Sequence, residues 1–155
     1  MRVNIPSRGE LELKAAVFDY NGTLANGGQL VEGVLDRLVM LSRTMDVYVI
    51  TADTFGTVRQ TLADFPVQVV VLSVEPGGPA KEKFVLSLGA SYVAAFGNGA
   101  NDALMLKAAG LGVVVLGDEG AAVETLVNAD IAVRTITEGI DLLLDPRRLV
   151  ATLRR

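Results

Sequence analysis

Residues 15–24 read Ala-Ala-Val-Phe-Asp-Tyr-Asn-Gly-Thr-Leu, a short apolar run that ends in the carboxylate of Asp19 and then turns at Gly22. Apolar runs without alternation are typical of strands that are buried on both faces of a sheet. A carboxylate at the end of such a strand can attack phosphorus as a nucleophile. It can equally cap a turn, because Asp-x-Asn-Gly is a common turn sequence. These residues alone leave both roles open for Asp19.

Similar runs recur along the chain and predict the other strands of a sheet. They lie at 47–51, 67–72, 92–96, 111–116 and 131–133. Apolar residues at helical spacing predict helices over 31–45, 55–64, 79–89, 101–109, 119–128 and 137–144. Strands that alternate with helices predict an α/β fold with a doubly wound parallel sheet.

Residues 2–14 have a different pattern, because apolar and polar residues alternate on both sides of a Ser-Arg-Gly turn. This pattern predicts an N-terminal β-hairpin with one solvent-facing side. We expect a single domain over residues 1–155, with the hairpin at 1–14, the core at 15–145 and the end of a C-terminal helix at 146–155. The arginines of the last segment are expected to favour a helix C-terminus.

Composition removes several classes of chemistry. The chain has 155 residues, half of them hydrophobic, and it contains neither cysteine nor histidine. Disulfides, thiolate nucleophiles, Ser-His triads and His-ligated metals are therefore excluded. The net charge of −4 gives no general attraction to nucleic acid. Because no long uninterrupted apolar run or signal peptide is found, we expect a cytoplasmic protein without membrane contact.

Polar residues also end the other predicted strands, and parallel strands bring their carboxyl ends to one edge of the sheet, where ligands bind. Thr51 closes the second core strand. Its hydroxyl can donate to a phosphoryl oxygen or cap a helix. Lys81 can neutralise phosphate charge or lie in solvent, and Lys83 competes with it for this role.

The segment 97–102, Gly-Asn-Gly-Ala-Asn-Asp, is a glycine-rich turn before a predicted helix. Asn98, Asn101 and Asp102 offer hard oxygen atoms of the kind that Mg²⁺ prefers. The same residues are also common helix caps, so the turn alone does not decide between the two roles.

The order of these motifs resembles the haloacid dehalogenase (HAD) superfamily of Mg²⁺-dependent enzymes that form an aspartyl-phosphate. Its first motif, Asp-x-Asp-Gly-Thr-Leu/Val, matches residues 19–24 except at the third position, and its fourth, Gly-Asp-Gly-x-Asn-Asp, matches residues 97–102 with one change. Thr51 corresponds to the second motif and Lys81 to the third. Within the superfamily, the chain is similar to the soluble proteins related to the phosphorylation domain of P-type ATPases.

The resemblance implies a role for each matching residue. Asp19 would be the nucleophile and a metal ligand. The catalytic set would be Asp19, Asn21, Thr51 and Lys81. Phosphate would be bound by Asn21, Gly22, Thr51, Ala52 and Lys81. Magnesium would be held by Asp19, the backbone carbonyl of Asn21, and the side chains of Asn98 and Asp102.

Two residues depart from the family pattern. Asn21 stands where phosphatases of the superfamily have an aspartate that exchanges protons with the leaving group and with water. Such help is typically worth ~10²–10⁴ in rate, so we expect Asp19 to be phosphorylated and only slowly dephosphorylated. Asn98 stands where the family has a metal-binding aspartate, so Asp102 must carry more of the site, and we expect weak Mg²⁺ binding.

The intervals between the motifs are too short for a cap domain, which needs on the order of 50 residues. We therefore predict an uncapped phosphohydrolase that acts on a phosphorylated small molecule or a nucleotide. The hairpin and the high apolar content are compatible with a homo-oligomer, although hairpins are more often simple edge elements.

Two alternatives remain open. A HAD-fold binding or regulatory module with weakened catalysis is favoured by Asn21 and Asn98. A response-regulator receiver also places Asp, Thr and Lys at strand ends. Receivers, however, carry the phosphorylated aspartate on the third strand, whereas Asp19 ends the first strand of the core.

Overall fold

The computed structural model describes residues 1–53, 56–72 and 77–155. The strands are β1 (Arg2–Ile5), β2 (Gly9–Glu12), β3 (Ala15–Asp19), β4 (Ala25–Asn26), β5 (Gln29–Leu30), β6 (Asp46–Thr51), β7 (Gln68–Val71), β8 (Val93–Gly97), β9 (Leu111–Val115) and β10 (Ile131–Val133). The helices are α1 (Val34–Leu41), α2 (Thr57–Thr61), α3 (Gly77–Ser87), α4 (Ala103–Ala108), α5 (Val123–Val127), α6 (Ile136–Leu144) and α7 (Pro146–Leu153), with short 3-10 turns at η1 (Ala90–Tyr92) and η2 (Ala100–Asp102).

A six-stranded parallel sheet forms the centre of the fold, in the order β10-β9-β8-β3-β6-β7. It confirms the predicted doubly wound α/β fold and contains all of the apolar runs expected as strands. From β3 the chain first adds β6 and β7 on one side and then crosses to β8 on the other. The connections therefore diverge between β3 and β8, and ligands of such sheets bind at the carboxyl ends of the strands at this switch point.

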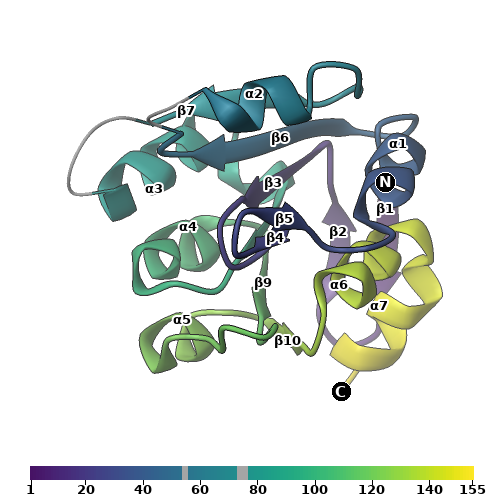
Figure 1. Cartoon of the computed structure of the whole chain (residues 1–155). Coiled ribbons are helices and arrows are strands. Elements are labelled where there is room, and N and C mark those ends of the chain that lie inside the picture. The colour runs from purple at the N-terminus through teal and green to yellow at the C-terminus, as the bar shows by residue number, and fades with distance from the viewer. Residues whose placement is uncertain (54–55, 73–76) are drawn as a thin grey trace.

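Helices cover both faces of this sheet, as Figure 1 shows, with α3, α4 and α5 on one side and α1 and α6 on the other. Alternate residues of a strand point to opposite faces. In β3, Val17 packs in the cluster that contains Val85 of α3 and Met105 of α4. Asp19, two residues further, therefore faces the α3 side at the carboxyl edge.

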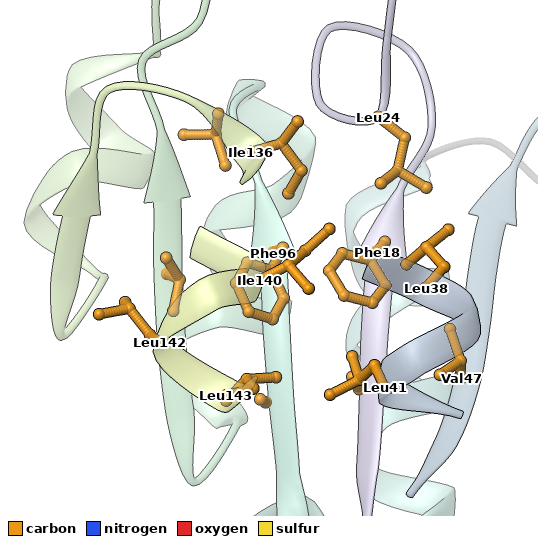
Figure 2. Close-up of a cluster of buried hydrophobic side chains, with 14 of the residues drawn as sticks. Phe18, Leu24, Leu38, Leu41, Val47, Phe96, Ile136, Ile140, Leu142 and Leu143 are labelled. Carbon is orange, nitrogen blue, oxygen red and sulfur yellow. The ribbon is translucent and has the colours of Figure 1, made fainter. Parts of the chain in front are cut away.

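Phe18 points to the opposite face and lies at the middle of the larger core cluster. Its ring stacks on that of Phe96 in β8, with centroids 4.5 Å apart. Leu38 of α1 and Ile140 of α6 cover the two rings (Figure 2). This packing fixes β3 against β8, the two strands from which Asp19 and the 97–102 turn project.

The N-terminal hairpin is present as predicted, since β1 and β2 pair antiparallel with Val3 opposite Leu11. The small β4–β5 hairpin was not expected from the sequence. Its strands have two residues each, joined by Gly27 and Gly28 in the left-handed region, and such short strands carry no hydrophobic period.

Several helix boundaries differ from the sequence prediction because glycines interrupt the apolar pattern. The helix expected over 31–45 begins after Gly33. The helix expected over 119–128 begins at Val123, because Gly117 and Gly120 have φ of 52° and 76°, which helices do not allow. The first residue of the helix expected over 55–64 lies outside the described residues.

The C-terminal segment is a separate helix, α7, rather than the end of a preceding one. Asp145 caps it by accepting a hydrogen bond from the Arg147 backbone N–H, and Pro146 occupies its first turn. Arg147 and Arg148 thus lie at the N-terminus of α7 and not at a helix C-terminus, whereas Arg154 is the C-cap of α7, as expected for the arginines of this segment. The guanidinium groups of Arg147 and Arg148 face Asp145 instead. Among the described residues, no helix has the length and apolarity needed to cross a membrane.

Candidate active site

A cavity of about 250 Å³ lies at the carboxyl edge of the sheet, beside the switch point between β3 and β8. Its lining comes from all of the predicted motifs and consists of Asp19, Asn21, Ile50, Thr51, Ala52, Leu72, Gly77, Lys81, Asn98, Gly99, Asn101 and Glu119. A wider hollow of about 520 Å³ lies at the amino edge, around Met1, Lys14 and Asp46. None of the predicted site residues lines it. The cavity at the carboxyl edge is therefore the candidate site.

Lys81 joins the first and fourth motifs at the floor of this cavity. Its Nζ donates to Asp19 Oδ1 at 2.7 Å and to Asp102 Oδ1 at 2.6 Å. Only 7% of Lys81 is exposed, whereas Lys83 is exposed on the outer side of α3. The structure thus decides which lysine reaches the site. Lys81 and Val85 share the buried face of the helix because they are four residues apart.

Burial is the main influence on the Asp19 carboxyl group. Its removal from water raises the pKa of Asp19 to about 7, and the nearby Asp102 charge acts in the same direction, while Lys81 opposes both. Burial by itself would lower the pKa of Lys81, but the two carboxylates raise it above its usual value. Lys81 therefore stays a cation, whereas Asp19 takes up a proton much more readily than an ordinary aspartate and is a carboxylate only above its raised pKa.

Asp102 is fixed entirely by the protein. Its Oδ1 accepts from Lys81, and its Oδ2 accepts from the backbone N–H groups of Asn98 and Gly99, both at 2.9 Å. The residue is fully buried. An ideal Cβ built on Gly97 would overlap the Asp102 carboxyl group, so a glycine is required there. Asp102 shapes the turn and orients Lys81, and its oxygens are occupied by these donors.

Thr51 and the backbone of Asn21 and Ala52 also line the cavity. Thr51 Oγ1 accepts from the Asp53 backbone N–H at 3.1 Å, which leaves the hydroxyl proton free to be donated into the cavity. Within the described part of the chain, the N–H groups of Asn21 and Ala52 have no acceptor, and both residues line the cavity. The Gly22 N–H instead donates to the Ala25 carbonyl at 2.7 Å. A phosphoryl group would therefore meet a hydroxyl, two amides and an ammonium.

The lining also includes Asn98 and Asn101 of the fourth-motif turn, together with Glu119, which the motif comparison did not assign to the site. Thr23 Oγ1 lies 3.3 Å from Asn98 Oδ1 and donates to it, and Asn98 Nδ2 donates to the Gly120 carbonyl at 3.0 Å. Glu119 follows strand β9 in a glycine-flanked loop, the same position relative to a strand that identified the other motifs. The sequence instead predicts a helix from residue 119, because apolar residues continue at helical spacing from there.

The donor atoms around the cavity fit a divalent cation of the Mg²⁺ type. The Asp19 carboxylate, the Asn21 carbonyl and the Asn98 amide oxygen are hard oxygen ligands, and Mg²⁺ commonly takes only one or two carboxylates, completing its shell with water and phosphate. Among residues 1–53, 56–72 and 77–155, three or more acidic side chains do not meet at one point. Any metal here would therefore rely on neutral oxygens as well as carboxylates.

Two proteins of Methanocaldococcus jannaschii are similar to the chain in sequence. No family model matches it. An uncharacterized protein of Methanocaldococcus jannaschii is 52% identical over 62 residues, which are 40% of this chain and 67% of that protein. A second uncharacterized protein of the same organism is 42% identical over 38 residues, which are 24% of this chain and 86% of that protein. The chain belongs to one sequence family with these proteins.

Solved structures with a similar fold include several phosphatases. The 3-deoxy-D-manno-octulosonate 8-phosphate phosphatase of Moraxella catarrhalis, solved with magnesium, phosphate and KDO, superposes with a TM-score of 0.69 at 17% identity, over 93% of this chain and 95% of the other. The cobalt-bound phosphatase of this type from Haemophilus influenzae gives 0.67 at 20% identity, over 86% and 88%. A Legionella pneumophila structure assigned to the HAD superfamily gives 0.69 at 19% identity, over 92% and 88%. The chain has the HAD fold.

Proposed function

We propose that this HAD-fold chain is a Mg²⁺-dependent phosphohydrolase that works through an aspartyl-phosphate on Asp19. The observation that carries the proposal is the contact of Lys81 with both Asp19 and Asp102 at the floor of a cavity at the sheet switch point. A lysine between two buried carboxylates costs desolvation energy, and such arrangements are concentrated at functional sites. The other lining groups are donors suited to phosphate.

Phosphoryl transfer requires mainly positioning and charge neutralisation. Lys81 binds Oδ1 of Asp19, so the other carboxylate oxygen is the one available to attack phosphorus. As the new O–P bond forms, the bond from phosphorus to the leaving oxygen breaks, and that oxygen takes a proton from water. Thr51 and the amides of Asn21 and Ala52 hold the equatorial oxygens. A magnesium ion on Asp19, Asn21 and Asn98 would neutralise phosphate charge.

In this proposal Asn21 determines the rate of the second half-reaction, the hydrolysis of the aspartyl-phosphate. Its side chain cannot accept a proton from the water that hydrolyses the acyl-phosphate. The intermediate should therefore persist, a property that fits the sequence resemblance to the soluble relatives of P-type ATPases. The same residue favours a second candidate function, a regulatory module that binds phosphate compounds with negligible turnover.

The substrate in this proposal is a phosphorylated small molecule or a nucleotide. A second cavity of about 320 Å³ adjoins the first and shares Asn21, Thr51 and Ala52 with it. Its outer part is lined by side chains that include Tyr20, Asp53, Thr57 and Thr61. Hydroxyl groups predominate there, so the leaving group should be polar and hydroxylated. The similar folds of phosphatases that act on a phosphorylated sugar acid support this substrate class.

A panel of phosphate esters and acyl phosphates assayed with Mg²⁺ tests the proposal, with phosphate release and acid-stable labelling of the protein as the two readouts. We expect labelling by a reactive acyl phosphate, slow release, and loss of both in Asp19→Asn. Lys81→Met should abolish labelling, whereas the matched change Lys83→Met, on the exposed side of α3, should not.

The two candidate functions predict different outcomes of this assay. Mg²⁺-dependent binding of beryllium fluoride without any labelling or release would select the regulatory module. Labelling that survives Asp19→Asn would refute both, since each assigns the phosphate site to that carboxylate.

A further inference from the structure

We infer that Glu119 is a metal-binding residue of this site and supplies the carboxylate that position 98 lacks. The inference rests on the proposed function, because it concerns the same cation. The resemblance to the superfamily places a ligand aspartate at position 98, where this chain has an amide. The structure places a different carboxylate, from the loop after β9, in the wall of the same cavity.

Glu119 and Asn98 converge at the first motif. An ideal Cβ added to Gly22 would lie 2.7 Å from Asn98 Nδ2, 2.8 Å from Asn98 Oδ1 and 2.8 Å from Glu119 Oε2. Both oxygens therefore approach one point beside the backbone of the nucleophile loop, where Gly22 has φ of 79° and no side chain. Asp19 and Asn21 line the same cavity. Because Gly22 has no side chain, the Asn98 amide group and the Glu119 carboxylate can both approach the backbone of the nucleophile loop.

Glu119 is exposed at the mouth of the cavity, and its carboxylate forms no hydrogen bond or ion pair with the residues that the structure describes, so it is free to bind a cation. Its neighbour Asp118, in contrast, accepts from Asn26 Nδ2 at 2.9 Å. A carboxylate that faces a cavity beside Asp19 raises the local negative potential. This unbalanced charge is what a divalent cation would neutralise.

The loop that carries Glu119 is held in place from both sides. Asn26 of the β4–β5 hairpin binds Asp118, and Asn98 binds Gly120 through its Nδ2 atom. The Ala122 N–H also donates to the backbone carbonyl of Asn98 at 2.9 Å. An aspartate at position 98 could not donate to Gly120 and would repel Glu119. The amide at 98 and the carboxylate at 119 are therefore two parts of one arrangement.

This arrangement changes the expectation for metal affinity. The neutral side chain at position 98 predicts weak Mg²⁺ binding when it is considered alone. With Glu119 the site again contains two carboxylates, Asp19 and Glu119, and neutral oxygens from Asn21 and Asn98. That set matches the ligands that Mg²⁺ prefers.

Direct binding of metal to the substrate-free protein tests the inference, by titration calorimetry with Mg²⁺ and by electron paramagnetic resonance with Mn²⁺. We expect Glu119→Gln to raise the dissociation constant for Mg²⁺ by about tenfold or more, because the bound ion loses one of its two carboxylate ligands. Glu124→Gln is the matched control, since Glu124 is exposed on α5 and does not line the cavity. It should leave the constant unchanged.

The double variant Asn98→Asp/Glu119→Gln returns the carboxylate to position 98 and should recover most of the lost affinity. Equal constants for wild type and Glu119→Gln would overturn the inference. So would a double variant that keeps the wild-type melting temperature and recovers no affinity. Failure of the proposed function would give a different result, with no Mg²⁺ binding in the wild type or binding unaffected by Asp19→Asn.

Discussion

Replacing Lys81 by methionine should destabilise the metal-free protein strongly, because it removes the cation between two buried carboxylates. The Asp102 side chain is 0% exposed and that of Asp19 is 11% exposed, and both lie within 2.7 Å of Lys81 Nζ. Removing one partner of a buried ion pair typically costs about 3–5 kcal/mol, since the other charge stays buried and uncompensated. The melting temperature should then fall by roughly 6–20 °C for a domain of this size.

The size of this loss should depend on pH. Without Lys81, the raised pKa of Asp19 rises further, so that below pH 7 the carboxyl group takes up a proton and avoids part of the cost. The destabilisation is therefore smaller at pH 6 than at pH 8.5. Adding Asp19→Asn to Lys81→Met removes one of the two charges and should recover part of the stability.

Urea unfolding in the presence of EDTA, followed by circular dichroism, measures these changes. Lys83→Met is the control, because Lys83 is exposed on the same helix and its loss should change stability by no more than about 0.5 kcal/mol. A loss below about 1 kcal/mol for Lys81→Met, or an equal loss at both pH values, would refute the reasoning.

Three further changes follow from the same geometry. Because burial raises the pKa of Asp19 from 3.8 to about 7, the folded metal-free chain holds a proton that the unfolded chain releases. The free energy of unfolding should therefore fall as the pH rises from 3.8 to about 7, and urea titrations of Asp19→Asn should show no such fall. Asn21→Asp restores a group that exchanges protons and should accelerate dephosphorylation by ~10²–10⁴; phosphate release no faster than in wild type would contradict this role. Gly97→Ala forces a Cβ against the Asp102 carboxyl group and should lower the melting temperature through about 1–3 kcal/mol of overpacking, with an unchanged value counting against the fixed position of Asp102.

The central sheet could be predicted from the sequence because buried parallel strands leave a simple signal. Runs such as 15–19 and 111–116 are apolar without alternation, and all of them became strands. The site edge followed from topology, since the carboxyl ends of parallel strands meet. The order of Asp19, Thr51, Lys81 and the 97–102 turn then indicated the fold family.

What the sequence could not provide depends on helix rotation and on loop paths. Lys81 and Lys83 are the same residue type two positions apart, so the sequence does not show which of them reaches the site. The rotation of α3 decides this, because Lys81 lies on the face that packs on the sheet and Lys83 lies on the exposed face. For Glu119 the apolar spacing of the residues that follow predicts a helix, although the glycines at 117 and 120 favour a loop. Its entry into the cavity depends on hydrogen bonds from Asn98 and Asn26, which connect segments distant in the chain.

The cavity at the carboxyl edge is assembled from β3, β6, α3, the η2 turn and the loop after β9. These residues are far apart in the sequence, and they meet only after β3 has paired with β6 and β8 and the loop after β9 has reached the same edge. A ligand that recognises only the complete fold shifts the folding equilibrium by mass action, by ~2.7 kcal/mol at a hundred times its dissociation constant. A cation held at this cavity would therefore add to the stability of the folded sheet, because it binds only where these distant segments have already come together.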